Sequence, residues 1–154
     1  MKNSILKLGF FMLLALSLNS CSEDDEKVER NDSSIIPATS FDRANQVLGT
    51  VYLGSRDITI SAWDHGTVDG DIVSIYVNGR LVIDEQTLGG PDDKIQVSTT
   101  LEYNGYNYIL LYAHNEGSIS PNTASISIND GTIDEEFTLE SNLYTNGAVD
   151  LVVD

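Results

Sequence analysis

The segment from Trp63 to Asp71 (WDHGTVDGD) holds the residues of this chain that are best suited to chemistry. It places three carboxylates within eight positions, together with two glycines that let the backbone fold back. Hard cations such as Ca²⁺ bind about six to eight oxygens from carboxylates, carbonyls and water. The spacing is not that of an EF-hand, and the alternative is an acidic turn without an ion, because Asp and Gly favour turns. The residues expected to bind Ca²⁺ are Asp64, Asp69, Asp71, Asn115 and Glu116.

Other side chains near these acids could contact a ligand. Trp63 could stack on a sugar ring, although a Trp at the end of a strand more often caps a core. His65 and His114 could join acidic residues in a zinc site, but surface and turn histidines are commoner than zinc ligands. The candidate ligand-binding residues are Trp63, His65, His114 and Asn122.

Motifs for catalysis are missing from the sequence. It contains no nucleophile elbow, no zinc-protease helix motif and no phosphate-binding glycine loop. Asp69 and Asp71 are two positions apart on one short loop, whereas glycoside hydrolysis needs two opposed carboxylates about 5 Å or more apart. We therefore expect that the protein is not an enzyme, and a hydrolase that uses the acidic loop is kept as an alternative.

Strands must position these loops, because apolar and polar residues alternate from residue 47 to the C-terminus. In the first such segment Val47, Val51 and Leu53 are expected on one face. Asn78-Gly79 gives the strongest hairpin signal of the chain. The predicted strands cover residues 47–53, 57–63, 72–77, 81–83, 94–101, 108–113, 123–128, 133–139 and 148–153.

No stretch of this part shows a helical period with caps. About nine strands in residues 47–154 predict an all-β fold, a single antiparallel β-sandwich that is immunoglobulin-like or jelly-roll-like. If every connection reverses the chain, alternate loops lie at the same end. Binding surfaces usually lie on long loops clustered in this way. The short connections at 54–56, 78–79, 104–105 and 130–131 then share one end, and the long loops at 64–71, 85–93, 114–122 and 141–147 share the other.

Residues 1–20 have the layout of a secretory signal peptide. Lys2 and Lys7 accompany an apolar run of about 11 residues, which is shorter than the roughly 20 residues of a membrane-spanning helix. Cys21 follows and is the only cysteine of the chain. The sequence Leu18-Asn19-Ser20-Cys21 resembles the bacterial lipobox, which implies that Cys21 carries lipid and becomes the mature N-terminus.

The acidic run after this cysteine (SEDDE, residues 22–26) resembles the export signal of Bacteroidota surface lipoproteins. A charged, solvated tether is the alternative, since most acidic runs serve that purpose. The resemblance implies an outer-membrane protein, anchored by its lipid and exposed at the cell surface. Residues 21–46 are expected to form a flexible acidic linker, because they are rich in Ser, Asp, Glu and Asn and lack periodicity.

The net charge limits the range of partners. It is −16 for the whole chain, and removal of a leader with two lysines and no acid brings it to −18. Such a surface repels nucleic acid and anionic lipid head groups. We expect no nucleic-acid partner, a membrane contact through the lipid anchor, and a glycan or protein as the ligand.

Two stretches together resemble a small β-sandwich domain of secreted and outer-membrane Bacteroidota proteins. They are W-D-x-G-x-x-D-G-D-x-V-S-x-Y-x-N-G at residues 63–79, and AHNEG at 113–117 followed by PNTA at 121–124. The resemblance covers residues 57–153 and implies the fold and the compartment, but no activity.

The sequence thus predicts a surface lipoprotein whose β-sandwich binds a glycan or a protein, assisted by Ca²⁺. The alternatives are a structural module of the cell envelope without a discrete ligand site, and the hydrolase.

Overall fold

The computed structural model describes residues 33–154. The signal peptide at 1–20, Cys21 and the linker up to residue 32 lie outside the described residues. The alternating segments form ten strands: β1 (Thr39–Ser40), β2 (Arg43–Leu53), β3 (Asp57–Asp64), β4 (Ile72–Val77), β5 (Arg80–Thr87), β6 (Ile95–Thr100), β7 (Tyr106–Ala113), β8 (Asn122–Asn129), β9 (Asp134–Ser141) and β10 (Thr145–Val153). Across the described range, no helix has the length and apolar character needed to cross a membrane.

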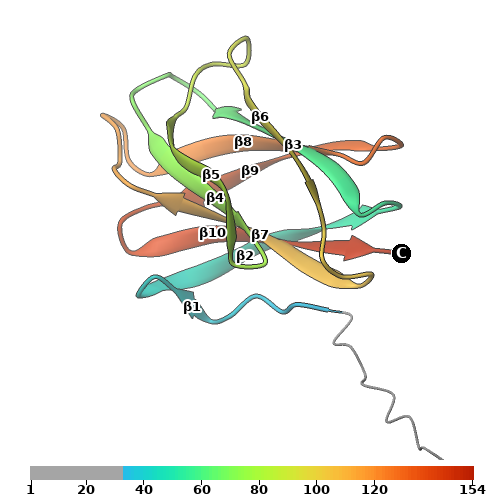
Figure 1. The fold of residues 1–154 in the computed structure, drawn as a ribbon. Coiled ribbons are helices and arrows are strands. Elements are labelled where there is room, and N and C mark those ends of the chain that lie inside the picture. Colours follow the sequence, from blue (N-terminus) through green and yellow to red (C-terminus); the bar gives the residue numbers. More distant parts are fainter. Residues whose placement is uncertain (1–32) are drawn as a thin grey trace, which may run out of the picture.

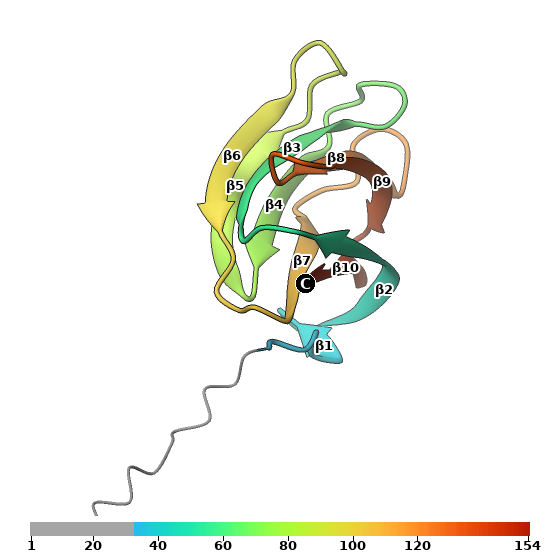
Figure 2. The same ribbon diagram turned by 90° about the vertical axis from the view of Figure 1, so that its right-hand side faces the viewer.

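The strands form two packed sheets, which confirms the predicted all-β sandwich. One sheet has six strands in the order β1-β2-β10-β7-β4-β5, and the other has four in the order β6-β3-β8-β9 (Figures 1 and 2). All neighbouring strands are antiparallel except β2 and β10. These two run parallel because an even number of chain reversals separates them.

The core lies between the sheets and is built from the inward side of each alternating strand. In β3, for example, Ile58, Ile60 and Ala62 are buried and face the other sheet. β7 is apolar on both faces from Tyr108 to Leu111, as expected for a central strand. Burial of this apolar surface is the main stabilising contribution in a domain without disulfides.

The sandwich begins earlier than predicted. A hairpin of β1 and β2 starts at Thr39, inside the segment 21–46 that was expected to be flexible. The guanidinium of Arg43 fixes this hairpin, because it donates hydrogen bonds to the carbonyls of Ala113 (2.7 Å) and Asn142 (3.0 Å). These contacts are distant in sequence, so local composition did not reveal them.

The predicted facing of Val47 is wrong, since its side chain is 52% exposed while Val51 and Leu53 are buried. The register explains the difference. Along the β2–β10 pair, Val47 lies beside Ala148 and Thr50 lies beside Asp150, so β2 contains one extra residue. Such a bulge reverses which side chains face inward, and Val47 therefore points out of the core.

Each end of the sandwich gathers the loops that chain reversal predicts. At the short-loop end the amide of Gly54 donates to the Asp130 carboxylate (2.8 Å). The loops after β3, β5, β7 and β9 lie at the other end, on the left and at the top of Figure 1, and the C-terminus lies on the right. Ser34 donates to the carbonyl of Tyr106, so the described chain enters at the short-loop end.

Candidate functional site

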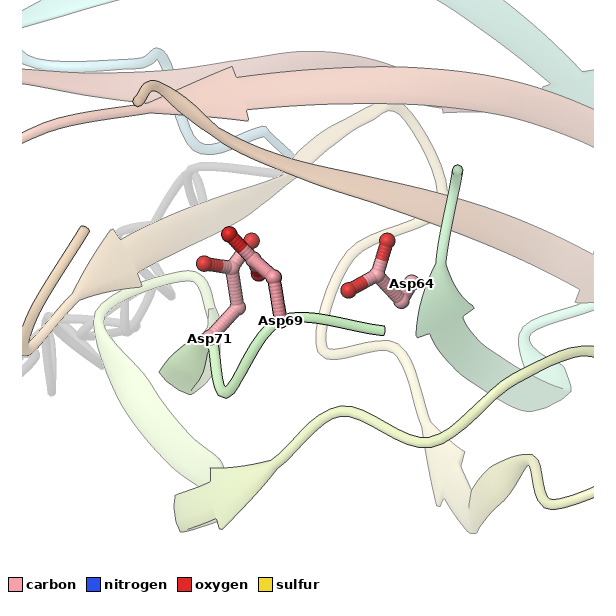
Figure 3. A group of neighbouring side chains, drawn as sticks. All are labelled: Asp64, Asp69 and Asp71. Atoms are coloured by element: carbon pink, nitrogen blue, oxygen red, sulfur yellow. The ribbon is translucent and has the colours of Figure 1, made fainter. Parts of the chain in front are cut away.

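Three aspartates meet at the long-loop end. Asp64 ends β3 and continues its inward face, opposite Ala124 of β8. Asp69 and Asp71 come from the following loop, which turns at Gly70 with a φ of 94° before β4 begins. One ligand atom from each aspartate lies within 4.8 Å of the others. Figure 3 shows the three carboxylates beside one another, with Asp69 and Asp71 in closest approach.

Backbone amides hold one oxygen of each carboxylate. Gly66 donates to Asp64 Oδ1 at 3.0 Å, and Thr123 donates to Asp71 Oδ2 at 3.3 Å. Asp69 Oδ2 accepts two bonds, from the amides of residues 118 (2.9 Å) and 119 (2.6 Å). The second oxygen of each aspartate receives no such bond. Each side chain is thus fixed through one oxygen and offers the other to a ligand.

The free oxygens of Asp64 and Asp71 are buried. Their side chains belong to residues only 4% and 3% exposed, and within the described structure Asp64 Oδ2 and Asp71 Oδ1 have no hydrogen-bond partner. Leaving a charged oxygen buried and unpaired is costly. An ion held by one oxygen of each aspartate, at the usual Ca²⁺–oxygen distance of about 2.3–2.6 Å, fits atoms no more than 4.8 Å apart. A proton shared between carboxyl groups is the other way to relieve the cost.

The electrostatics of the cluster follow from this crowding. Burial, followed by the negative charge of Asp69 and then that of Asp64, raises the pKa of Asp71 to about 7, although the hydrogen bond from the amide of Thr123 lowers it. A free Asp71 is therefore about half protonated at neutral pH. A cation would displace that proton, because metal ligands must be deprotonated.

Asn115, which is predicted as a metal ligand, braces the loop through both of its polar atoms. Its side-chain amide accepts from the amide of Ile72 (2.8 Å) and donates to the carbonyl of Gly70 (2.8 Å). The two bonds lie on either side of Asp71 in the chain. Asn115 therefore fixes the backbone that carries this aspartate.

Gly117 lies directly against the carboxylates. A Cβ at this position would come within 2.5 Å of Asp71 Oδ1 and 2.6 Å of Asp69 Oδ1, and its φ of 54° also disfavours larger residues. Sequence reasoning did not assign Gly117 to the site. Its only signal was a place in the AHNEG stretch at residues 113–117, while the amide donors at 118, 119 and 123 left no side-chain signature.

A cavity of about 210 Å³ adjoins the aspartates. It is polar on the side of the acids and apolar at Ile119 and Pro121. Its lining residues are Asp64, His65, Gly66, Thr67, Asp69, Asp71, Ile119, Pro121 and Thr123.

Of the other predicted binding residues, one lines the cavity and two lie outside it. His65 lines the cavity, and its Nδ1 lies 2.9 Å from the hydroxyl of Ser125. Glu116 lies outside the cluster and accepts from the amide of Leu143 at 3.4 Å. Asn122 is fully buried, next to Thr123, and neither atom of its amide has a partner in the described structure.

Trp63 faces away from the aspartates, because neighbouring residues of a strand point to opposite sides. It is 5% exposed, and the ammonium of Lys94 lies 3.6 Å from the centre of its ring. The ring is thus covered and does not form an open platform for a sugar.

His114 directly follows β7 and contacts residues of the six-stranded sheet, so the two histidines do not converge. Its Nε2 lies 2.8 Å from Ser74 Oγ, and its Nδ1 lies 3.7 Å from the carboxylate of Glu85. Ser74, His114 and Glu85 thus follow one another as in a serine hydrolase triad. However, Ser74 is fully buried, and its hydroxyl already accepts a hydrogen bond from the amide of Glu85 (3.0 Å). A nucleophile must reach its substrate, so this arrangement is a packing contact.

Comparison with known proteins gives no relative for this chain, because no family model, no curated protein and no solved structure matches it.

Proposed function

We propose that the protein is a lipid-anchored β-sandwich of the outer cell surface that binds Ca²⁺ at Asp64, Asp69 and Asp71. The long-loop end then binds an external glycan or protein. One observation carries the proposal: buried, preoriented carboxylate oxygens remain unpaired in the described structure. Three carboxylates suit a hard cation, and the lack of a histidine or thiolate in the cluster favours Ca²⁺ over zinc.

The direction of the chain supports a binding role. The amide of Ser34 donates a hydrogen bond to the carbonyl of Tyr106, at the start of β7. The aspartates lie beyond the other end of that strand, where the amide of His114 donates to the carbonyl of Ile72. A tether that starts at Cys21 would therefore reach the domain at the end opposite the cluster. The acidic end would point away from the membrane, toward ligands outside the cell.

The rival is a structural module of the cell envelope with no ion. This alternative is supported by Asp71, whose pKa is raised to about 7, because a proton on this residue would also reduce the repulsion between the carboxylates at neutral pH. The two proposals differ in what stabilises the domain above pH 7. A proton is lost there, whereas an ion binds more tightly.

Thermal unfolding at pH 8 separates them. The soluble chain 22–154 keeps every described residue and would be melted with 10 mM Ca²⁺ and without divalent cations. Extracellular modules bind Ca²⁺ with dissociation constants of about 10⁻⁴–10⁻³ M. Linkage then predicts a stabilisation of about 1.4–2.7 kcal/mol, or a rise in Tm of roughly 4–10 °C.

Asp69→Asn combined with Asp71→Asn should abolish this shift. Asp92→Asn is the matched control, because Asp92 is an exposed acid in the loop after β5, at the same end of the sandwich and outside the cavity lining. Its shift should equal that of the unmodified chain. An unchanged melting point with Ca²⁺, or a shift that survives the double substitution, would contradict the proposed site.

A further inference from the structure

The proposed Ca²⁺ site is incomplete by itself. Each aspartate gives one free oxygen, since the other is held by backbone amides. Ca²⁺ takes about six to eight oxygens, so about three to five positions remain for other ligands. Asn115 supplies none of them with a free amide, because both of its polar atoms already bind the backbone. Backbone carbonyls of the loops, water or an external ligand must fill the remaining positions, and the cavity beside the cluster gives an external ligand access to them.

The cavity beside the cluster limits what that ligand can be. At about 210 Å³ it is smaller than the roughly 300–1,000 Å³ of pockets for drug-sized molecules, so it suits one ring or one short group. Ile119 is 59% exposed and, together with Pro121, gives the cavity an apolar wall. His65, Thr67 and Thr123 provide polar groups on the same lining.

Charge decides between the remaining ligands. A divalent ion compensates two of the three carboxylates and leaves the site at about −1, in a chain whose total charge is −16. An anionic sugar or a carboxylate peptide would be repelled. A neutral group with two adjacent oxygens fits, because both oxygens can enter the open coordination positions while an apolar face lies on Ile119.

We infer that the cavity binds one neutral sugar residue, whose vicinal hydroxyls complete the coordination of a Ca²⁺ ion held by Asp64, Asp69 and Asp71. This inference rests on the proposed Ca²⁺ site and goes beyond it by naming the ligand. The sugar binds only through the ion, so chelation and loss of the aspartates have the same effect on it.

Luminescence of bound Eu³⁺, a hard ion that substitutes for Ca²⁺, tests the open coordination without any sugar. Lifetimes in H₂O and D₂O count the waters on the ion. We expect at least about three waters on Eu³⁺ bound to the chain 22–154. A count of one or none would mean that the protein closes the site, and it would overturn the inference while leaving the Ca²⁺ site intact.

A glycan array with neutral and anionic glycans tests the ligand. Binding to neutral glycans that is lost in chelator and restored by Ca²⁺ supports the inference. Ile119→Ala should weaken this binding several-fold, because it removes part of the apolar wall of the cavity. The Ca²⁺ melting shift of the same variant shows whether the ion is still held, since the amide of residue 119 also donates to Asp69. Asp92→Asn should bind as the unmodified chain does.

Three results would overturn the sugar inference in a chain that does show the Ca²⁺ shift. They are binding to anionic glycans alone, sugar binding that chelator leaves unchanged, and no neutral glycan bound above the level of the Asp69→Asn, Asp71→Asn chain. A chain without any Ca²⁺ shift would instead refute the proposed function itself, so the two failures are distinguishable.

Discussion

Asp71→Asn should stabilise the metal-free protein, and the gain should appear only as the pH rises. Burial, followed by the charge of Asp69, raises the pKa of Asp71 to about 7 from the 3.8 of an unperturbed aspartate. The folded state therefore holds a proton that the unfolded chain releases. The free energy of unfolding of the unmodified protein should fall as the pH rises from about 4, and level off above about 7. Asparagine has nearly the same shape and never ionises.

The size of the gain follows from the two pKa values. A difference between 3.8 and about 7 corresponds to at most about 4 kcal/mol, at about 1.36 kcal/mol for each pKa unit. Water in the adjoining cavity and relaxation of the loop reduce the cost of the charge. We expect Asp71→Asn to be more stable by about 1–2 kcal/mol at pH 8 and equal to the unmodified protein near pH 4.

Urea unfolding from pH 4 to pH 8.5, in buffers freed of divalent cations, measures this difference. Burial also raises the pKa of Asp150. Subtracting the free energies of the two variants at each pH removes such shared contributions. Asp92→Asn controls for the change in net charge. Addition of 10 mM Ca²⁺ at pH 8 should narrow or reverse this difference, because the ion adds about 1.4–2.7 kcal/mol to the unmodified protein alone.

A difference between Asp71→Asn and the unmodified protein that stays constant across this pH range would refute the reasoning. It would mean that Asp71 titrates alike in the folded and unfolded chains. The burial and crowding of its carboxyl group would then have no electrostatic consequence.

Three further predictions concern Gly117 beside the aspartates, the expected lipid anchor at Cys21, and Asp130 at the short-loop end. Gly117→Ala should lower the Tm and weaken Ca²⁺ binding, because its Cβ would meet carboxylate oxygens at 2.5–2.7 Å and its φ of 54° costs a non-glycine residue about 1 kcal/mol. A Ca²⁺ titration followed by melting measures both effects. Gly49→Ala is the control, because Gly49 lies in β2, outside the site, with open space around its Cβ position. Cys21→Ser should release the protein from membranes while leaving its circular dichroism unchanged, and persistent membrane attachment in cell fractionation would contradict the lipid anchor. Asp130→Ala should lower the Tm, because backbone amides and the Thr132 hydroxyl hold the pKa of Asp130 well below its usual range. In the unmodified protein the stabilisation by Asp130 should fade as the pH falls below about 4. An unchanged Tm in Asp130→Ala at pH 7 would contradict this stabilising role.

The strands were predictable wherever apolar residues alternate without interruption. The segments 72–77 and 123–128 match β4 and, within a residue, β8. Alternation is a local signal, because neighbouring side chains of a strand point to opposite sides. It fails at Val47, where a bulge in β2 changes the facing, and the bulge is visible only in the pairing with β10.

The first hairpin was missed because its residues read as a linker. Phe41 and Asp42 both have positive φ, which is uncommon for residues other than glycine. Long-range contacts hold this turn in place. The ring of Phe41 lies 4.7 Å from that of Tyr76, and Asn146 donates to the carbonyl of Ser40 (3.0 Å). A linker and an edge hairpin of similar composition differ only in such contacts.

The site, like the strands, has features that the sequence predicts and features that only the folded chain shows. Spacing alone brings Asp69 and Asp71 into one loop, and chain reversal predicts that residues 114–122 approach them. Only the folded chain decides which oxygens are free, because that depends on the amides of Gly66, Thr123 and residues 118 and 119.

The sequence by itself determined the sandwich, the end of the sandwich at which its acids gather, and the expectation of a lipid anchor at Cys21. The first two rest on periodicity, turn residues and spacing, which act over a few positions, and the third rests on the resemblance of residues 18–21 to a lipobox. The tertiary structure decided which oxygens of Asp64 and Asp71 are unpaired, that Asn115 is a brace and that Trp63 is covered. Those outcomes depend on contacts between strands far apart in the chain, whose register and facing are set only when the two sheets pack together.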